Sequence, residues 1–238
     1  MSSQSNQFQL EGFTSAPSLF TPGEATTMRE NVERYLKDVA PGLAKTDAIT
    51  ARPQSGEELT DQFVFLSRMD LHDSFFETLK QDSRLSDLAR DLLGGEVEVQ
   101  HVQFLDIIPG ISRPTPPHQD AQFFALNPSH AVTFWIPLSE MTVEHGCLHY
   151  VPGSHWNGYL AHADTGSLRL KDERGCRDRG LAMPVKPGDL LAHHCFTIHY
   201  SAENLSGLSR WALAIHFYPK GSERLNEREW MHRNKPAA

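Results

Sequence analysis

Short segments rich in Val, Ile, Phe and Trp, separated by glycine and proline, fill the second half of the chain. They cover residues 97–108, 131–138, 147–151, 181–185, 190–194 and 211–218. No helical pattern of the kind that a βαβ crossover needs lies between them, which argues against a parallel sheet. The pattern therefore predicts two antiparallel sheets packed as a jelly roll, a cupin-like architecture.

Helical patterns dominate the residues before this β-rich part. Apolar side chains recur at helical spacing over 22–39, where Thr21 and Pro22 supply a cap and a first-turn proline. Helical spacing returns over 74–80 and 84–93, whereas residues 41–60 are predicted as a loop. We expect one α+β domain, mainly β, over 1–238. Its expected parts are a mainly helical region (1–96), a jelly-roll core that carries the site (97–220) and a C-terminal helix or tail (221–238), so that N-terminal and flanking helices surround the roll.

The composition narrows the class of protein. With 39% hydrophobic and 22% charged residues among 238, the chain suits a globular domain. The net charge of -8 includes no long basic run, so we expect a small-molecule partner, no nucleic acid and no membrane surface. Three cysteines without paired spacing, no leader-like start and no membrane-length apolar run predict a cytoplasmic protein.

Two His-x-Asp triplets are candidates for a metal site, His118-Gln-Asp120 and His162-Ala-Asp164. On an extended segment the first and third side chains point to one face, so an imidazole and a carboxylate can reach the same ion. The first triplet follows a proline-rich turn and leads into an apolar segment, whereas the second lies in a polar loop. We predict His118 and Asp120 as ligands, with His199 as the third ligand from a distant strand.

Two histidines and one carboxylate can occupy one face of iron(II) and leave positions open for a co-substrate and dioxygen. Zinc hydrolases use the same ligand types. Arg210, on the strand expected beside that of His199, favours iron, because a forked guanidinium suits the far carboxylate of 2-oxoglutarate. Ser201 lies two residues after His199, on the same strand face, and is predicted to add a hydroxyl to that carboxylate.

Several motifs in order resemble the phytanoyl-CoA dioxygenase family of iron(II)- and 2-oxoglutarate-dependent oxygenases. They are PTPPHQDAQFF, VTFWIPL, EHGCLHYVPGSHWNG, KPGDLLAHH and TIHYSAENLSGLSRWAL. The resemblance implies a double-stranded β-helix, catalytic metal ligands at His118, Asp120 and His199, and O2 as oxidant. It also implies that 2-oxoglutarate lies on Arg210 and Ser201, and that Gln103 and Trp135 line the co-substrate or substrate pocket.

The resemblance implies hydroxylation of an aliphatic C–H bond in a small or medium-sized organic substrate, with release of succinate and CO2. Desaturation, epoxidation and cyclisation with the same cofactors stay open, as does a non-catalytic jelly roll that binds metal or 2-oxoglutarate. Similar proteins act on acyl-CoA esters, amino acids, osmolytes, phosphonates and natural-product intermediates. Many bacterial members carry a lysine where this chain has Ile107, so any contact made by that lysine is absent here.

The substrate pocket has weaker signals. Phe123, Phe124 and Asn127 directly follow the metal triplet and are candidates for its floor, although aromatic pairs in such places are often core. Arg113 could meet an anionic group. The polar stretch 156–180 fits an active-site lid and an ordinary loop equally well. We interpret five further histidines as structural: His149, His155, His193, His194 and His216.

Overall fold

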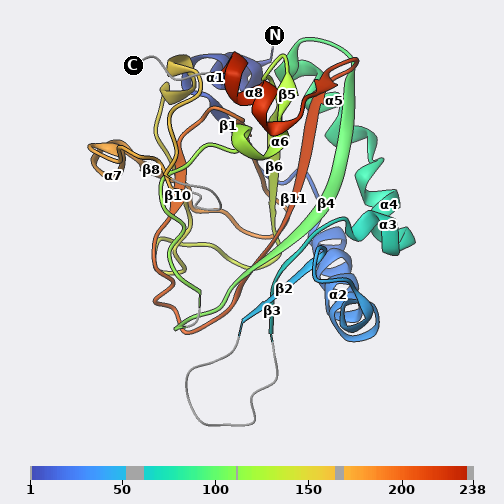
Figure 1. Cartoon of the computed structure of the whole chain (residues 1–238). Coiled ribbons are helices and arrows are strands. Elements are labelled where there is room, and N and C mark those ends of the chain that lie inside the picture. Colours follow the sequence, from blue (N-terminus) through green and yellow to red (C-terminus); the bar gives the residue numbers. More distant parts are fainter. Residues whose placement is uncertain (1, 52–61, 111, 164–168, 235–238) are drawn as a thin grey trace.

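Two antiparallel sheets form the body of the protein in the computed structural model, which describes residues 2–51, 62–110, 112–163 and 169–234 (Figure 1). The larger sheet has the order β1 (Phe13–Ala16), β9 (Leu190–His194), β6 (Val132–Pro137), β11 (Arg210–Pro219), β4 (Val97–Ile107), β3 (Gln62–Leu66) and β2 (Ala48–Ala51). The smaller sheet has the order β10 (His199–Ser201), β7 (Leu148–Tyr150) and β8 (Leu181–Ala182), and β12 (Glu223–Arg224) pairs with β5 (Leu126–Asn127). The expected jelly roll is confirmed.

Helices cover the outer side of the larger sheet. α2 (Pro22–Asp38) begins where the sequence predicts it, because Thr21 and Glu24 cap each other: Glu24 N donates to Thr21 Oγ1 at 3.3 Å and Thr21 N donates to Glu24 Oε2 at 2.7 Å. Figure 1 shows α2, α3 and α4 beside β3 and β4. The other helices are α1 (Ser3–Glu11), α3 (Met69–His72), α4 (Ser74–Lys80), α5 (Ser83–Leu93), α6 (Ala121–Phe124), α7 (Cys176–Arg179) and α8 (Glu227–Arg233), with short 3₁₀ turns η1 (Ala40–Gly42) and η2 (Ser154–Asn157).

Alternation along the strands divides the larger sheet into two faces. Phe104, Phe134 and Leu213 point outward into the hydrophobic core beneath the helices, and each is fully buried. Burying a side chain of this size contributes about 1.5–3 kcal/mol. The alternate positions point into the roll, where β4 presents Gln103 and β6 presents Thr133. The helical layer therefore stabilises the sheet from one side and leaves its inner face for a site.

The structure adds three short strands to the mainly helical region before Val97. Strands β1, β2 and β3 lie there and join the larger sheet, whereas the sequence predicted helices and a loop. The loop predicted over 41–60 is wrong for Ala48–Ala51, and residues 52–60 lie outside the described part. These short strands at the sheet edges owe their conformation to pairing with distant strands, which a local pattern does not contain. Within the described part of the chain, none of the helices has the length and apolar character needed to cross a bilayer.

Candidate metal centre and cavity

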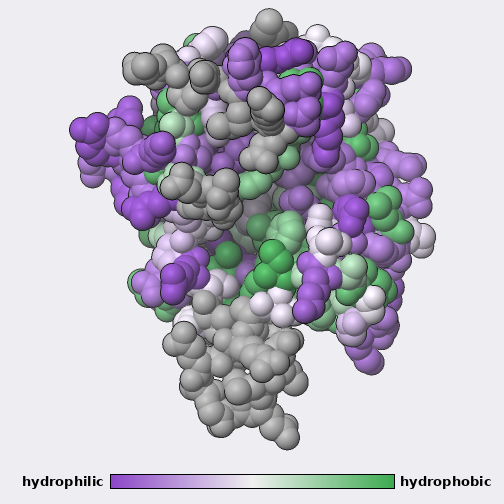
Figure 2. Space-filling view, viewed as in Figure 1, coloured by the Kyte–Doolittle hydropathy of each residue, from purple (hydrophilic) through white to green (hydrophobic). Residues whose placement is uncertain are grey.

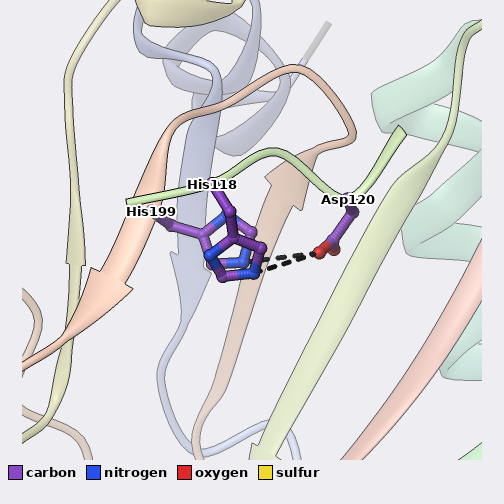
Figure 3. A group of neighbouring side chains, drawn as sticks. All are labelled: His118, Asp120 and His199. Carbon is purple, nitrogen blue, oxygen red and sulfur yellow. Dashed lines mark ion pairs between the residues drawn. The ribbon is translucent and has the colours of Figure 1, made fainter. Parts of the chain in front are cut away.

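His118, Asp120 and His199 come together with one ligand atom each within 4.8 Å of the others (Figure 3). The Oδ1 atom of Asp120 lies 3.7 Å from His118 Nε2 and 3.4 Å from His199 Nε2. The two imidazole rings lie side by side with their centroids 4.0 Å apart. Two histidine nitrogens and one carboxylate oxygen therefore face a common point, as the sequence predicted.

Backbone pairing holds the two histidines in register. The N–H of His118 donates to the carbonyl of His199 and the N–H of His199 donates to the carbonyl of His118, both at 3.0 Å. The side-chain Nδ1 of His118 donates to Pro116 O at 2.9 Å, and that of His199 donates to Thr197 O at 3.0 Å. Each ring is thus fixed in the tautomer that leaves the Nε2 lone pair free for a metal.

The other oxygen of the Asp120 carboxylate is held by two donors. Thr133 Oγ1 donates to Asp120 Oδ2 at 2.6 Å, and His193 Nε2 donates to the same oxygen at 3.0 Å. Tyr150 in turn lies 2.9 Å from His193 Nδ1 and donates its hydroxyl hydrogen there, since burial raises the pKa of Tyr150 well above its usual value. These two hydrogen bonds leave Oδ1 as the oxygen of Asp120 that is free to bind a metal.

The electrostatics of the three side chains suit a metal site. Burial lowers the pKa of His118 and holds that of His199 well below its ordinary value, so both rings are neutral near pH 7. Burial alone would raise the pKa of Asp120, but the neighbouring His199 and His193 keep it well below its usual range. Neutral imidazoles and an ionised carboxylate are the protonation states that bind a divalent metal.

The triad opens into a cavity of about 570 Å³ on the inner side of the larger sheet. Most of its wall is apolar, and Figure 2 shows hydrophobic residues gathered near the centre of this face, where β2 and β3 lie in Figure 1. Ile49 and Phe123 are more than half exposed and line the cavity, so they mark its mouth. A pocket of this size accommodates a small organic molecule.

Arg210 lines the same cavity although it is only 1% exposed. Its guanidinium donates to Gly146 O and lies over the Trp135 ring at 6.0 Å, while its Nε has no hydrogen-bond partner. Burial lowers the pKa of Arg210 to about 10, which leaves the side chain charged at neutral pH. Among the described residues it forms no ion pair with a carboxylate. A buried cation with an unused donor fits an anionic ligand, because an unpaired buried charge is otherwise costly.

Some of the remaining predicted residues line the cavity and others do not. Gln103, Trp135, Phe123 and Phe124 line the cavity. Ser201 is fully buried on β10 outside the cavity lining, and its Oγ accepts a hydrogen bond from Thr115 N at 3.1 Å. Asn127 on β5 and the exposed Arg113 are also not among the lining residues.

The alternative triplet has a different environment. His162 Nε2 accepts a hydrogen bond from Gln119 N at 3.1 Å, and its Nδ1 donates to Leu160 O at 2.9 Å. Both ring nitrogens are therefore used to hold the segment between the metal ligands. Asp164, the other residue of that triplet, lies outside the described residues.

Sequence reasoning missed three residues that support the site: Thr133, His193 and His216. His193 and His216 had been interpreted as structural, yet both line the cavity. One signal was available for His216, because it lies at an even spacing from Arg210 on β11 and so faces the same side of the sheet. For His193 the chain offered no such reference residue on its own strand.

The fold and the site define a jelly-roll protein with a two-histidine, one-carboxylate metal centre beside a cavity that contains a buried arginine. Over residues 8–212 the chain matches the family described as Phytanoyl-CoA dioxygenase (PhyH), and it belongs to that family.

Two curated relatives illustrate the similarity. The phytanoyl-CoA dioxygenase of Arabidopsis thaliana is 30% identical over 167 residues, which cover 68% of this chain and 59% of that protein. The phytanoyl-CoA dioxygenase domain-containing protein 1 of Mus musculus is 25% identical over 258 aligned residues, which cover 90% of this chain and 88% of that protein. The chain thus spans about three fifths of the length of the Arabidopsis relative, and 47% of a rice relative is matched.

Solved structures show the same fold. The epimerase SnoN, in complex with Fe3+, alpha ketoglutarate and nogalamycin RO, is 21% identical with a TM-score of 0.77, and the match covers 94% of this chain and 85% of SnoN. The non-heme alpha ketoglutarate dependent carbocyclase SnoK from nogalamycin biosynthesis is 23% identical with a TM-score of 0.74, and the match covers 100% of this chain and 94% of SnoK.

Proposed function

We propose that the protein is an iron(II)- and 2-oxoglutarate-dependent dioxygenase that hydroxylates an aliphatic C–H bond of a small or medium-sized organic substrate. The observation that carries the proposal is the buried Arg210 in the cavity of the metal triad. The triad alone would also suit a zinc hydrolase, whereas a cation with a free donor in the same cavity gives a dicarboxylate its second anchor. Membership of a dioxygenase family supports the same assignment.

The donor set fits the cofactors that this function requires. His118 Nε2, His199 Nε2 and Asp120 Oδ1 would hold the iron, and this donor set is typical of non-haem iron(II) oxygenases. When bound, iron supplies the redox chemistry that couples dioxygen to the conversion of 2-oxoglutarate into succinate and CO2.

The residues of the chain bind and orient the reactants. Arg210 binds the far carboxylate of the co-substrate, and the carbonyl of Gly146 fixes the guanidinium. Ser201 remains a candidate for a second contact, because its hydroxyl hydrogen is still available after its oxygen accepts from Thr115 N. The apolar wall excludes water from the reacting centre, which strengthens the electrostatic interactions there.

Uncoupled turnover tests the proposal without knowledge of the substrate. Protein incubated with iron(II), 2-oxoglutarate and dioxygen should release succinate, and the Asp120→Ala variant should release none above the protein-free background. Asp178→Ala is a matched control, because Asp178 is an exposed carboxylate on α7. Equal succinate release by Asp120→Ala and the wild-type protein would contradict the proposal. Once a substrate is found, a product heavier by one oxygen atom distinguishes hydroxylation from desaturation or cyclisation, which remove two hydrogen atoms. A new exchangeable hydroxyl hydrogen in the product distinguishes hydroxylation from epoxidation, which adds the same mass.

We also propose that the partner is a small molecule rather than nucleic acid or a membrane, and that the protein acts in the cytoplasm. The cavity supports a small-molecule partner. All three cysteines, Cys147, Cys176 and Cys195, are free and buried, which suits a reducing compartment.

A further inference from the structure

A row of polar side chains crosses the inner face of the larger sheet beside Asp120. His216 on β11 stands opposite Thr133 on β6, which stands opposite His193 on β9. Thr133 Oγ1 lies 2.6 Å from Asp120 Oδ2, and His216 Nδ1 lies 3.0 Å from Thr133 Oγ1. The amide of Gln103 on β4 lies 3.1 Å from His216 Nε2. A continuous hydrogen-bond relay thus joins the metal-binding carboxylate to the cavity wall at Gln103.

The carboxylate fixes the direction of the first hydrogen bonds in this relay. An ionised carboxylate can only accept, so Thr133 donates its single hydrogen to Asp120, and the short distance of 2.6 Å is typical of a charge-assisted bond. The Thr133 oxygen must then accept from His216, which places the imidazole proton on Nδ1. Burial lowers the pKa of His216 to about 4, so the ring carries only that proton and Nε2 is an acceptor.

The state of His216 decides how Gln103 is oriented. Only the NH2 group of Gln103 can donate to a bare Nε2. The structure has Oε1 at this position, and a flip of the amide exchanges the two ends without changing the shape of the side chain. In the flipped orientation the carbonyl oxygen of Gln103 faces the cavity as an acceptor.

In the described part of the chain, the wall around Gln103 is mainly apolar. Among the described residues that line the cavity, Arg210 and Asp120 are the charged side chains, and the proposed function assigns both to co-substrate and metal. Ala214 lies between Gln103 and Trp135 in one row of the sheet, so its small side chain leaves room in front of the amide. The apolar lining includes Ile49, Phe65, Leu105, Ile107 and Leu148.

We propose that the substrate is an uncharged, mainly hydrocarbon molecule with a hydroxyl or similar donor, and that this donor binds the carbonyl oxygen of Gln103. His216 acts as a positioning residue, because it holds the Gln103 amide in the orientation that Asp120 and Thr133 dictate. This substrate class rests on the proposed function, since it assigns Arg210 to 2-oxoglutarate.

A matched set of rigid probes tests the proposal by binding rather than by turnover. 1-Adamantanol donates a hydrogen bond, whereas 1-methoxyadamantane and 2-adamantanone only accept, and adamantane-1-carboxylate is charged. Their affinities are measured by calorimetry for the metal-free protein and for the protein loaded with redox-inert zinc and 2-oxoglutarate. The alcohol should bind about tenfold more tightly than the ether or the ketone, because only the alcohol can donate a hydrogen bond to the partly buried Gln103 oxygen.

Two variants isolate the relay. His216→Phe removes the partner of Gln103, so the preference for alcohol over ketone should fall to about one. His149→Phe should retain the preference, because His149 stacks on Tyr200 in the smaller sheet and does not line the cavity. If His216→Phe fails to fold, Gln103→Leu should abolish the preference in its place.

Four results would overturn the proposal: equal or tighter binding of the ketone by the wild-type protein, an unchanged preference in the folded His216→Phe variant, no binding of any neutral probe, or strongest binding by the carboxylate in the protein loaded with zinc and 2-oxoglutarate, where Arg210 is already occupied. Failure of the proposed function gives a different pattern. In that case the alcohol preference appears in the metal-free protein, whereas 2-oxoglutarate does not bind to the zinc-loaded protein.

Discussion

Replacing His193 by phenylalanine should weaken metal binding although His193 is not expected to touch the metal. The change keeps an aromatic ring at this position of β9, between β1 and β6, but removes the N–H that donates to Asp120 Oδ2 at 3.0 Å. Thr133 then remains as the donor to that oxygen. One hydrogen bond to a charged group contributes about 1.5–3 kcal/mol, which corresponds to roughly 10- to 100-fold in affinity.

Competition with a chromophoric chelator measures this loss as an apparent zinc affinity at neutral pH. Tyr150→Phe should cause a smaller loss, because its hydroxyl acts on Asp120 only through His193. His149→Phe serves as the control for replacing a partly buried histidine that does not line the cavity and stacks on Tyr200 instead. A folded His193→Phe protein with wild-type zinc affinity would refute the idea that this hydrogen bond orients the carboxylate.

Three further predictions concern the buried charges and a glycine. Arg210→Met should raise the half-saturating concentration of 2-oxoglutarate by roughly 10- to 100-fold. The melting temperature of the metal-free protein should not fall, because the substitution removes a buried cation. An unchanged half-saturating concentration would show that Arg210 does not bind the co-substrate. Gly146→Ala should weaken 2-oxoglutarate binding several-fold in the same assay. The φ of Gly146 is 67° and a Cβ there would lie 2.5 Å from Ala202 O, so the substitution should displace the Gly146 carbonyl that holds Arg210. An unchanged half-saturating concentration of 2-oxoglutarate would show that this carbonyl is dispensable. Burial lowers the pKa of His194 to about 3 and that of His162 to about 4, so below about pH 6.5 the unfolded chain binds protons that the folded protein does not. Between neutral pH and pH 4 the unfolding free energy in urea titrations should fall by about 3 kcal/mol for the buried His194 and by less for the partly exposed His162. Equal urea midpoints at both pH values would contradict this direction.

The parts of the fold that could be predicted have local signals. Thr21, Pro22 and Glu24 define the start of α2 within four residues, and the β-rich segments alternate with glycine and proline turns. Strands β2 and β3 have no such signal. β3 pairs with Phe104 and Leu105 far along the chain, and among the described strands β2 pairs with β3 alone. Helix α1 was also not predicted, because it has no apolar stripe at helical spacing. Phe8 is its buried apolar residue.

The grouping of His118, Asp120 and His199 could be predicted because strand alternation and motif order both constrain these residues. The residues that hydrogen-bond the Asp120 carboxylate could not be predicted, because their positions depend on the register between strands. Thr133 meets Asp120 only because β6 lies between β9 and β11, and His193 reaches the same oxygen from the neighbouring strand. The hydrogen bond from Arg210 to Gly146 O likewise could not be predicted from the sequence, because Gly146 belongs to a turn that is distant along the chain.

Anaerobic titration of the metal-free protein with iron(II) and then 2-oxoglutarate tests the central claim most directly. The account predicts a visible charge-transfer band when the co-substrate chelates the bound iron. The band should be absent in His118→Ala and should require far more 2-oxoglutarate in Arg210→Met. A folded, iron-loaded wild-type protein that gives no band at saturating 2-oxoglutarate would contradict the assignment of the cavity to that co-substrate.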